Sequence, residues 1–273
     1  MSQQPVSIHQ IQAQFGTDSA NYEVLTDAAI RSKGVEGAAV EIGVRLGGGL
    51  QRIIDGLVGS GQTPEKPVFG IDPYGNIEYY RDEIFKEGRC DYTNDMRDIC
   101  MINMYLYCRQ KNVNFYMFNL EDTEFFNRYA DGVPIYAEHK SILNKYSVVH
   151  FDGPHTLGAL DTEIAFFLER SDPGAVFVFD DVEMYEHAAV HNQLLEHGME
   201  TAMETPRKWS YVKRNMSTKS GSQWLVLLDG NLTQHNIHLS LVQFLIIKLI
   251  FEDYRSFHSC ENKHVQIIKT VVD

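Results

Sequence analysis

Two short apolar segments of the chain end in carboxylates. One of them, "VVHFD", ends in Asp152, and His155 follows three residues later; the other, "VFVFDD", ends in Asp180 and Asp181. Three carboxylates held close together repel one another, and a divalent cation removes that repulsion. Mg²⁺ prefers oxygen ligands and keeps waters that substrate hydroxyls can replace. These acids therefore predict a magnesium site, although Asp181 could instead cap the following helix.

A histidine beside such a site can take part in proton transfer. A neutral imidazole, with a pKa near ~6.5, can accept the proton of a hydroxyl group whose own pKa a bound metal has lowered. For His155 the alternatives are a hydrogen bond within the turn and a contact with a metal ligand. His150 lies inside a predicted strand and is interpreted as a core residue. His187 and His191, one helical turn apart, form a second candidate pair of metal ligands.

Short apolar segments alternate with helical segments along most of the chain. The predicted strands are 38–44, 67–72, 113–122, 146–153, 175–181, 208–214 and 222–228. Such alternation predicts an α/β fold with a parallel sheet and helices on both faces. Ligands bind these sheets at the carboxyl ends of the strands, so the acids are expected to point into a shared crevice.

The same pattern predicts three parts of the chain. Residues 1–34 form an N-terminal helical segment, 35–229 form the α/β domain, and 230–273 form a C-terminal extension for which a helical conformation is one candidate. The extension is rich in apolar positions, so it is also a candidate contact for a homo-oligomer. The polar, tyrosine-rich segment 73–92 predicts a loop, which either covers the crevice or lies on the surface.

A glycine turn follows the first predicted strand in "VEIGVRLGGGL". The spacing of Glu41, Gly43 and Gly47 fits neither the dinucleotide fingerprint nor a phosphate-binding loop of the Walker type. Glycine nevertheless lets the backbone approach a ligand closely. Asp72 ends the next strand, where a carboxylate can accept both ribose hydroxyls of a nucleoside. Its alternative role is to cap a helix or a loop.

Five motifs in this order carry a resemblance to a known family: "VEIGVRLGGG", "GIDPYG", "HFDGPHT", "PGAVFVFDD" and "KWSYVKR". The chain resembles the class I S-adenosylmethionine-dependent methyltransferases, and more narrowly the metal-dependent sugar O-methyltransferases of the macrocin type. The resemblance covers about 35–228 and departs at Arg45, where many methyltransferases have glycine. It implies a Rossmann-like, doubly wound, mostly parallel sheet of seven strands.

The resemblance also implies roles for residues of this chain. The cofactor-binding residues would be Glu41, Gly43, Gly47, Asp72, Asn119 and Asp122, with either Asn119 or Asp122 near the adenine. The Mg²⁺ ligands would be Asp152, Asp180 and Asp181. The catalytic residues would be Asp152 and His155, with His155 as the base that takes the hydroxyl proton.

The function implied is S-adenosylmethionine-dependent O-methyl transfer to a hydroxyl of a sugar or a glycosylated small molecule. Two alternatives stay open. One is a catechol-type or other small-molecule O-methyltransferase, which shares the metal chemistry but not the acceptor. The other is a non-catalytic binding protein with the same fold.

The composition of the chain limits the kinds of partner that it can bind. The 273 residues carry 37 acids against 24 Lys and Arg, a formal net charge of −13, which argues against a nucleic acid or an anionic membrane as partner. The four cysteines include no CxxC pair, and the N-terminus lacks the pattern of a signal peptide. The longest apolar stretch, 239–251, is too short to span a bilayer. These features predict a cytoplasmic protein.

Overall fold

The computed structural model describes residues 15–17, 19–75, 79–80, 88–89, 92–136, 139–215, 224–228, 231–234 and 267–269. The chain divides into two compact units, Met1–Asn215 and Met216–Asp273. The crevice predicted from the sequence belongs to the first unit, so most of the description concerns that unit.

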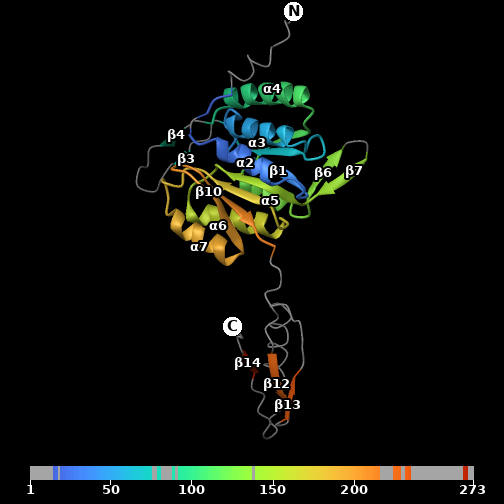
Figure 1. Cartoon of the computed structure of the whole chain (residues 1–273). Helices are drawn as coiled ribbons and strands as arrows, with labels where there is room; N and C mark the ends of the chain where they lie inside the picture. Colours follow the sequence, from blue (N-terminus) through green and yellow to red (C-terminus); the bar gives the residue numbers. More distant parts are fainter. Residues whose placement is uncertain are drawn as a thin grey trace, which may run out of the picture. The chain divides into compact units, whose positions relative to one another are not determined.

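A sheet of seven strands forms the centre of the first unit (Figure 1). Its strands, in spatial order, are β10 (Met199–Glu204), β11 (Trp209–Lys213), β9 (Val176–Phe179), β8 (Tyr146–Phe151), β1 (Ala38–Ile42), β2 (Val68–Ile71) and β5 (Phe115–Phe118). The pairs from β9 to β5 are parallel, whereas β11 is antiparallel to both of its neighbours. This arrangement confirms the predicted seven-stranded, mostly parallel sheet.

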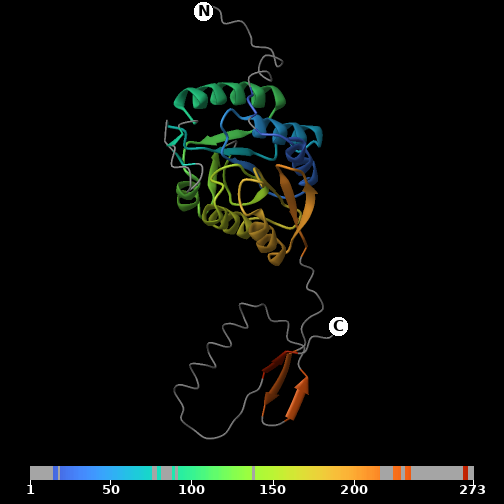
Figure 2. The same cartoon turned by 90° about the vertical axis from the view of Figure 1, so that its left-hand side faces the viewer.

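Helices cover both faces of this sheet (Figures 1 and 2). One face carries α2 (Glu23–Arg31), α3 (Gly48–Gly59) and α4 (Asn94–Lys111), and the other carries α5 (Asp122–Arg128), α6 (Leu157–Glu169) and α7 (His187–Glu196). Because both faces are covered, the central strands are buried along their whole length, as the five residues of β1 and the six of β8 are. Because both faces of these strands are buried, their sequences are continuously apolar and do not alternate between apolar and polar residues.

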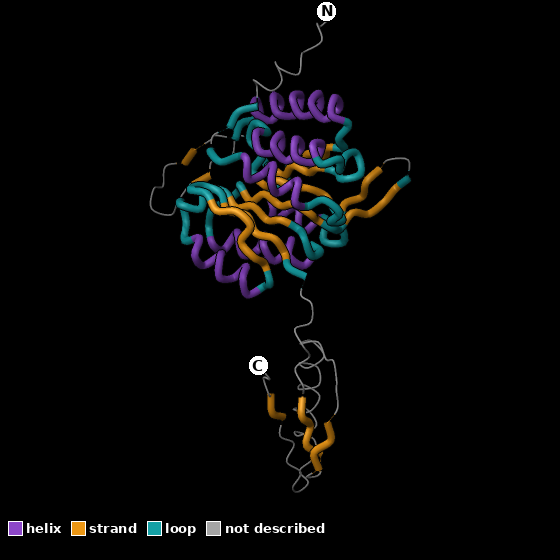
Figure 3. The backbone as a smooth tube through the Cα atoms, in the orientation of Figure 1, coloured by secondary structure: helices purple, strands orange, loops and turns teal. Residues whose placement is uncertain are grey.

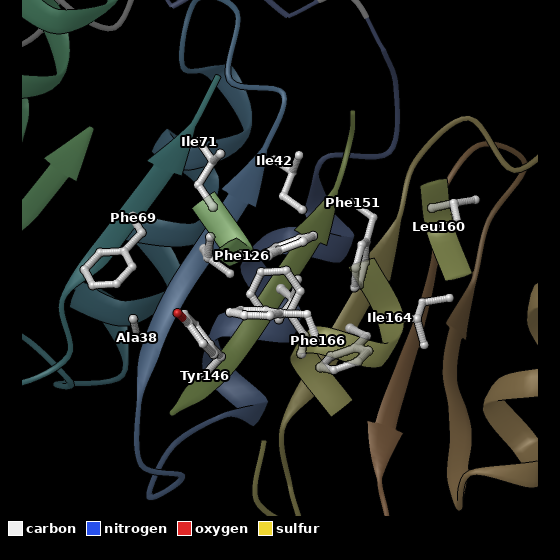
Figure 4. Close-up of a cluster of buried hydrophobic side chains, with 14 of the residues drawn as sticks. Ala38, Ile42, Phe69, Ile71, Phe126, Tyr146, Phe151, Leu160, Ile164 and Phe166 are labelled. Atoms are coloured by element: carbon white, nitrogen blue, oxygen red, sulfur yellow. The ribbon is translucent and has the colours of Figure 1, made fainter. Parts of the chain in front are cut away.

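Each face of the sheet has its own apolar core. Successive residues of a strand point to opposite faces, so Val40 and Ile42 pack towards α5 and α6, while Ala39 packs towards α3. The core under α6 is largely aromatic, and Figure 4 shows Phe151 and Phe166 within it. Phe151 stacks on the ring of Phe179 with 4.5 Å between ring centroids.

The sheet takes its edge strand from a segment that the sequence pattern did not identify. The predicted last strand, 222–228, corresponds to β12 (Trp224–Leu228), which pairs with β13 (Asn231–Gln234) and β14 (Ile267–Lys269) in the second unit. The edge position belongs instead to β10. Its sequence, "METAME", has no apolar run because only Met199 is buried there.

The remaining described elements are small. Two hairpins, β3 (Tyr79–Tyr80) with β4 (Gly88–Arg89) and β6 (Val133–Tyr136) with β7 (Lys140–Leu143), lie outside the central sheet (Figure 3). In the predicted N-terminal helical segment, α2 is the helix that the described residues contain, and residues 1–14 and 18 lie outside them. Within the described part of the chain, no helix is both long and apolar enough to cross a membrane.

The strand order reverses at β1, since the chain moves from β1 to β2 on one side and returns to β8 on the other. A crevice at the carboxyl ends of the strands is expected at such a reversal. The fold therefore places the candidate site above the ends of β1, β2 and β8.

Candidate functional site

A cavity of about 380 Å³ opens at this reversal point. It is lined by Ile42, Gly43, Ile71, Asp72, Pro73, Tyr74, Tyr92, Leu120, Glu121, Asp122, Asp152, Gly153, Pro154, His155 and Thr156. Five of the residues predicted for the site are in this lining: Gly43, Asp72, Asp122, Asp152 and His155. Glu41, Gly47 and Asn119 are not.

Gly43 forms the floor of the cavity, where the chain leaves β1. Its φ is 80°, and a Cβ atom at this position would lie 2.0 Å from the carbonyl oxygen of Asp152. The left-handed conformation and the close approach both require glycine. Gly47 also has a positive φ, 83°, and it is the N-cap residue directly before α3. The glycine turn therefore brings two strand ends together and starts the helix behind them.

Glu41 lies below this turn and does not line the cavity. Its Oε2 accepts a hydrogen bond from Leu50 N at 3.0 Å, and its Oε1 lies 2.7 Å from Nδ1 of His150. Both side chains are buried, and burial raises the pKa of Glu41. Glu41 and His150 are paired residues of β1 and β8 and point to the same face of the sheet. The structure thus places Glu41 where it holds the start of α3.

Asp72 is fully buried at the end of β2. Its Oδ2 accepts hydrogen bonds from Val44 N and Arg45 N, and its Oδ1 accepts one from Tyr74 N, all at 2.9 Å. Burial raises its pKa to about 6, and these hydrogen bonds hold it from rising further. A carboxylate offers about four acceptor positions. Backbone N–H groups use three of these positions, and among the described residues no donor is recorded for the fourth, on Oδ1.

The end of β5 presents Asp122 to the cavity and turns Asn119 away. Asn119 is exposed, and its Nδ2 lies 3.4 Å from the carbonyl oxygen of Asp72. Asp122 is the first residue of α5. Of the two residues proposed for the adenine end, Asp122 is therefore the one in contact with the cavity.

Glu163 lies behind Asp122 and was not predicted from the sequence. It is fully buried on α6, and neither of its carboxyl oxygens has a donor among the described residues. Burial, together with the neighbouring carboxyl of Asp122, raises the pKa of Glu163 well above its ordinary value. Glu163 therefore keeps its proton to a higher pH than an exposed glutamate does.

This protonated state predicts the pH dependence of stability. Because the folded protein holds a proton on Glu163 that the unfolded chain releases above pH ~4.3, stability falls as pH rises towards the folded-state pKa. The slope is at most about 1.4 kcal/mol per pH unit. We expect Glu163→Gln to remove this loss. The free energy of unfolding in urea, relative to that of the wild type, should then rise from about pH 5 to about pH 8. Glu169→Gln, on an exposed residue of the same helix, is the control, and parallel pH profiles for all three proteins would contradict the assignment.

His155 faces the other end of the cavity. Its Nε2 lies 3.9 Å from Oδ1 of Asp152, and its Nδ1 lies 3.9 Å from Oδ2 of Asp181. The imidazole is parallel to the ring of Tyr185, at 5.9 Å between centroids. A histidine flanked by two carboxylates is suited to take up a proton, because the carboxylates stabilise the positive charge that forms.

The three acids predicted to bind Mg²⁺ do not come together. Asp180 continues the alternation of β9 and points to the α2 face, where its Oδ1 lies 2.7 Å from Nζ of Lys208. Asp181 leaves the strand with a φ of 49° and forms an ion pair with Arg207. The two acids separate because the left-handed φ of Asp181 turns the chain out of the direction that Asp180 still follows. The predicted ligand set of Asp152, Asp180 and Asp181 is therefore not assembled in the structure.

Among the described residues, one group of three side chains brings ligand atoms within 4.8 Å of one another: Glu41, His150 and Asp152. This set fits Mg²⁺ poorly. Both oxygens of Glu41 already have partners, and one of the three ligands would be an imidazole, whereas Mg²⁺ prefers oxygen ligands in octahedral geometry. The donor set does not support a magnesium site here.

The second candidate metal pair has a different role. Nε2 of His187 and Nδ1 of His191 contact the hydroxyl of Tyr211 at 2.9 and 3.1 Å. Nδ1 of His187 contacts the hydroxyl of Tyr185 at 3.0 Å. Burial, with a smaller effect of His191, lowers the pKa of His187 to about 4. His187 thus anchors Tyr185, the ring on which His155 lies, whereas His191 holds the hydroxyl of Tyr211.

Comparisons with known proteins bear on the fold of the chain. No protein-family model matches the sequence, and neither does any curated protein. Solved structures do match the fold. One is the calicheamicin methyltransferase CalS11, with 14% identity, a TM-score of 0.50, and coverage of 75% of this chain and 79% of that one. Another is an O-methyltransferase from Bacillus cereus in complex with SAH, with 11% identity, a TM-score of 0.50, and coverage of 76% and 89%.

The chain has the class I methyltransferase fold. The antiparallel strand β11 between β9 and β10 and the reversal at β1 belong to the seven-stranded, mostly parallel sheet that the resemblance implied. The Bacillus cereus structure contains SAH. In open α/β sheets ligands bind at the carboxyl ends of the strands, and the cavity of this chain lies there. At these identities the likeness extends to the fold alone.

Proposed function

We propose that this chain is an S-adenosylmethionine-dependent O-methyltransferase that acts on a hydroxyl of a small molecule. The observation that carries the proposal is the buried Asp72 carboxylate, which keeps one acceptor position open at the floor of the cavity. That position would accept a ribose hydroxyl. Asp122 would face the adenine, and Gly43 would leave space for the rest of the cofactor.

His155 is the residue that we propose as base. When bound, S-adenosylmethionine supplies an electrophilic methyl group. His155 lines the same cavity, so it can receive the proton of an acceptor hydroxyl placed there. The carboxylates of Asp152 and Asp181, each 3.9 Å away, then stabilise the imidazolium. Asp152 thus has a supporting role in catalysis.

The acceptor class is the finer part of the proposal. A sugar or a glycosylated small molecule is the first class to test, and the resemblance of the sequence motifs supports it. A catechol-type or other small-molecule hydroxyl is the second class. Mg²⁺ assistance is left out, because the described acids do not form the oxygen site that it requires.

Cofactor binding tests the proposal first. We expect isothermal titration of the full chain to show one site for S-adenosylmethionine and for S-adenosylhomocysteine, with dissociation constants within about 1 μM–1 mM. NAD⁺ is the control, since the glycine spacing does not fit a dinucleotide. Binding of NAD⁺ without binding of either sulfur compound would overturn the proposal.

Transfer of a labelled methyl group tests the second step. Incubation with S-[methyl-³H]adenosylmethionine and panels of sugars, glycosylated compounds and phenols should label one panel above the background. Cofactor binding with no labelled product in any panel would favour the non-catalytic alternative.

A further inference from the structure

The ammonium of Lys208 occupies the centre of a closed polar cluster at the end of β9. Its Nζ lies 2.7 Å from Oδ1 of Asp180 and 2.7 Å from Oγ of Ser19. Ser19 in turn donates a hydrogen bond to Asp180 at 2.9 Å. The ring of Tyr22 covers the ammonium at 4.4 Å from its centroid. Lys208 and Asp180 have exposed fractions of 0% and 1%, so solvent does not reach the pair.

A buried cation of this kind is stable only if its partners satisfy it. The three donors of an ammonium here meet a carboxylate, a hydroxyl and the face of an aromatic ring. Although burial alone would raise the pKa of Asp180, the charges of His150 and Lys208 and the hydrogen bonds from Lys208 and Ser19 hold it below its usual value. The charge of Asp180 is therefore compensated within the chain.

The negative charge of Asp181 is compensated in the same way, by Arg207, the residue before Lys208. Arg207 forms ion pairs with Asp181 and, at 3.0 Å from its Nε, with Glu183. Arg207 and Lys208 are adjacent and lead into β11, so one short segment provides both cations. The repulsion that predicted a divalent ion at these acids is thus removed without one.

We propose that the acceptor end of the cavity, around Asp152 and His155, works without a divalent metal, because Lys208 compensates the charge of Asp180 and Arg207 that of Asp181. This inference rests on the proposed function. In the reaction the bond from sulfur to the methyl carbon breaks and a bond from the acceptor oxygen to that carbon forms. The hydroxyl proton moves to His155, and the sulfur leaves as a neutral thioether. No metal chelate is needed, so a single hydroxyl suffices as acceptor.

Metal binding is the direct test, and Mn²⁺ is the probe because electron paramagnetic resonance detects it. With S-adenosylhomocysteine present, the wild-type chain should show no saturable Mn²⁺ binding below about 1 mM. Lys208→Met removes the ammonium and should raise the affinity for Mn²⁺ at least ~10-fold, because Asp180 loses its cation. Lys213→Met is the matched control. Lys213 is the last residue of β11, the strand that follows Lys208, and its Nζ contacts the carbonyl oxygens of Leu168 and Ser171, so this variant should gain no affinity for Mn²⁺.

The outcomes separate the two proposals. Saturable Mn²⁺ binding by the wild type in the micromolar range, lost in Asp180→Asn, would overturn the inference while leaving cofactor binding intact. Absence of S-adenosylhomocysteine binding in the same samples would instead overturn the proposed function. If Lys208→Met does not fold, Lys208→Arg keeps the charge and should match the wild type, and a gain of Mn²⁺ binding by Lys208→Arg would count against the inference.

Discussion

We expect His155→Ala to lower the rate of the proposed methyl transfer by about 10²–10⁴-fold, the range that general-base catalysis contributes. The physical reason is that the acceptor hydroxyl loses the only imidazole in the described cavity lining, and with it the residue placed to take its proton. The residues proposed for cofactor binding, Asp72 and Asp122, lie on other strand ends. Titration with S-adenosylhomocysteine should therefore give the same affinity as in the wild type. Turnover is measured with labelled cofactor once an acceptor is known.

The control for this variant is His139→Ala, which removes an exposed histidine outside the cavity. It should leave turnover unchanged. A pH profile separates a base from a merely structural histidine: the wild type should lose activity at acid pH, where imidazole is protonated, and the residual activity of His155→Ala should not follow that limb. Equal turnover in His155→Ala and the wild type would remove the proposed role.

The architecture could be predicted from the sequence because its strongest signals are local. Buried parallel strands such as β8 and β9 appear as short apolar segments, and glycine at Gly43 marks a turn that no other residue can form there. The prediction of a strand failed where the apolar pattern was weak. The edge strand β10 is half exposed and polar, so nothing in its composition separates it from a loop.

The site was predicted only in part, because residue type does not give direction. Asp152 and His155 follow the end of β8 and reach the cavity as expected. Asp180 and Asp181 were placed together because they are adjacent in sequence. The left-handed backbone of Asp181, which separates the two side chains, has no signal in its residue type.

The partners of these acids could not be found in the same way. Lys208 and Arg207 are far from them in the sequence, and only the pairing of β11 with β9 brings them close. Ser19 comes from the segment before α2 and completes the cluster from still farther along the chain. The sequence shows how many carboxylates follow the strands. It does not show which cations neutralise them, because tertiary structure brings those cations close.

The largest effect on stability is expected from Gly43→Ala. The left-handed conformation costs an alanine about 1–2 kcal/mol, and the added Cβ would meet the carbonyl oxygen of Asp152 at 2.0 Å, so the two strand ends must separate. Overpacking of this kind costs a further ~1–3 kcal/mol. We expect the free energy of unfolding, measured with urea, to fall by about 2–5 kcal/mol. Because Gly43 and Asp152 both line the cavity, methyl transfer should fall as well, by up to ~10²-fold.

Gly59→Ala provides the matched control for this prediction. Gly59 is the last residue of α3, it is exposed, and a Cβ atom there meets nothing within 4 Å. Alanine is the better helix former, by up to about 1 kcal/mol, so this variant should be as stable as the wild type or more stable, with unchanged cofactor affinity. The contrast between the two substitutions isolates the contact between β1 and β8 from the general effect of replacing glycine. If Gly43→Ala unfolded at the same urea concentration as Gly59→Ala, the close approach of Gly43 to Asp152 would not exist in solution, and the floor of the cavity would need another description.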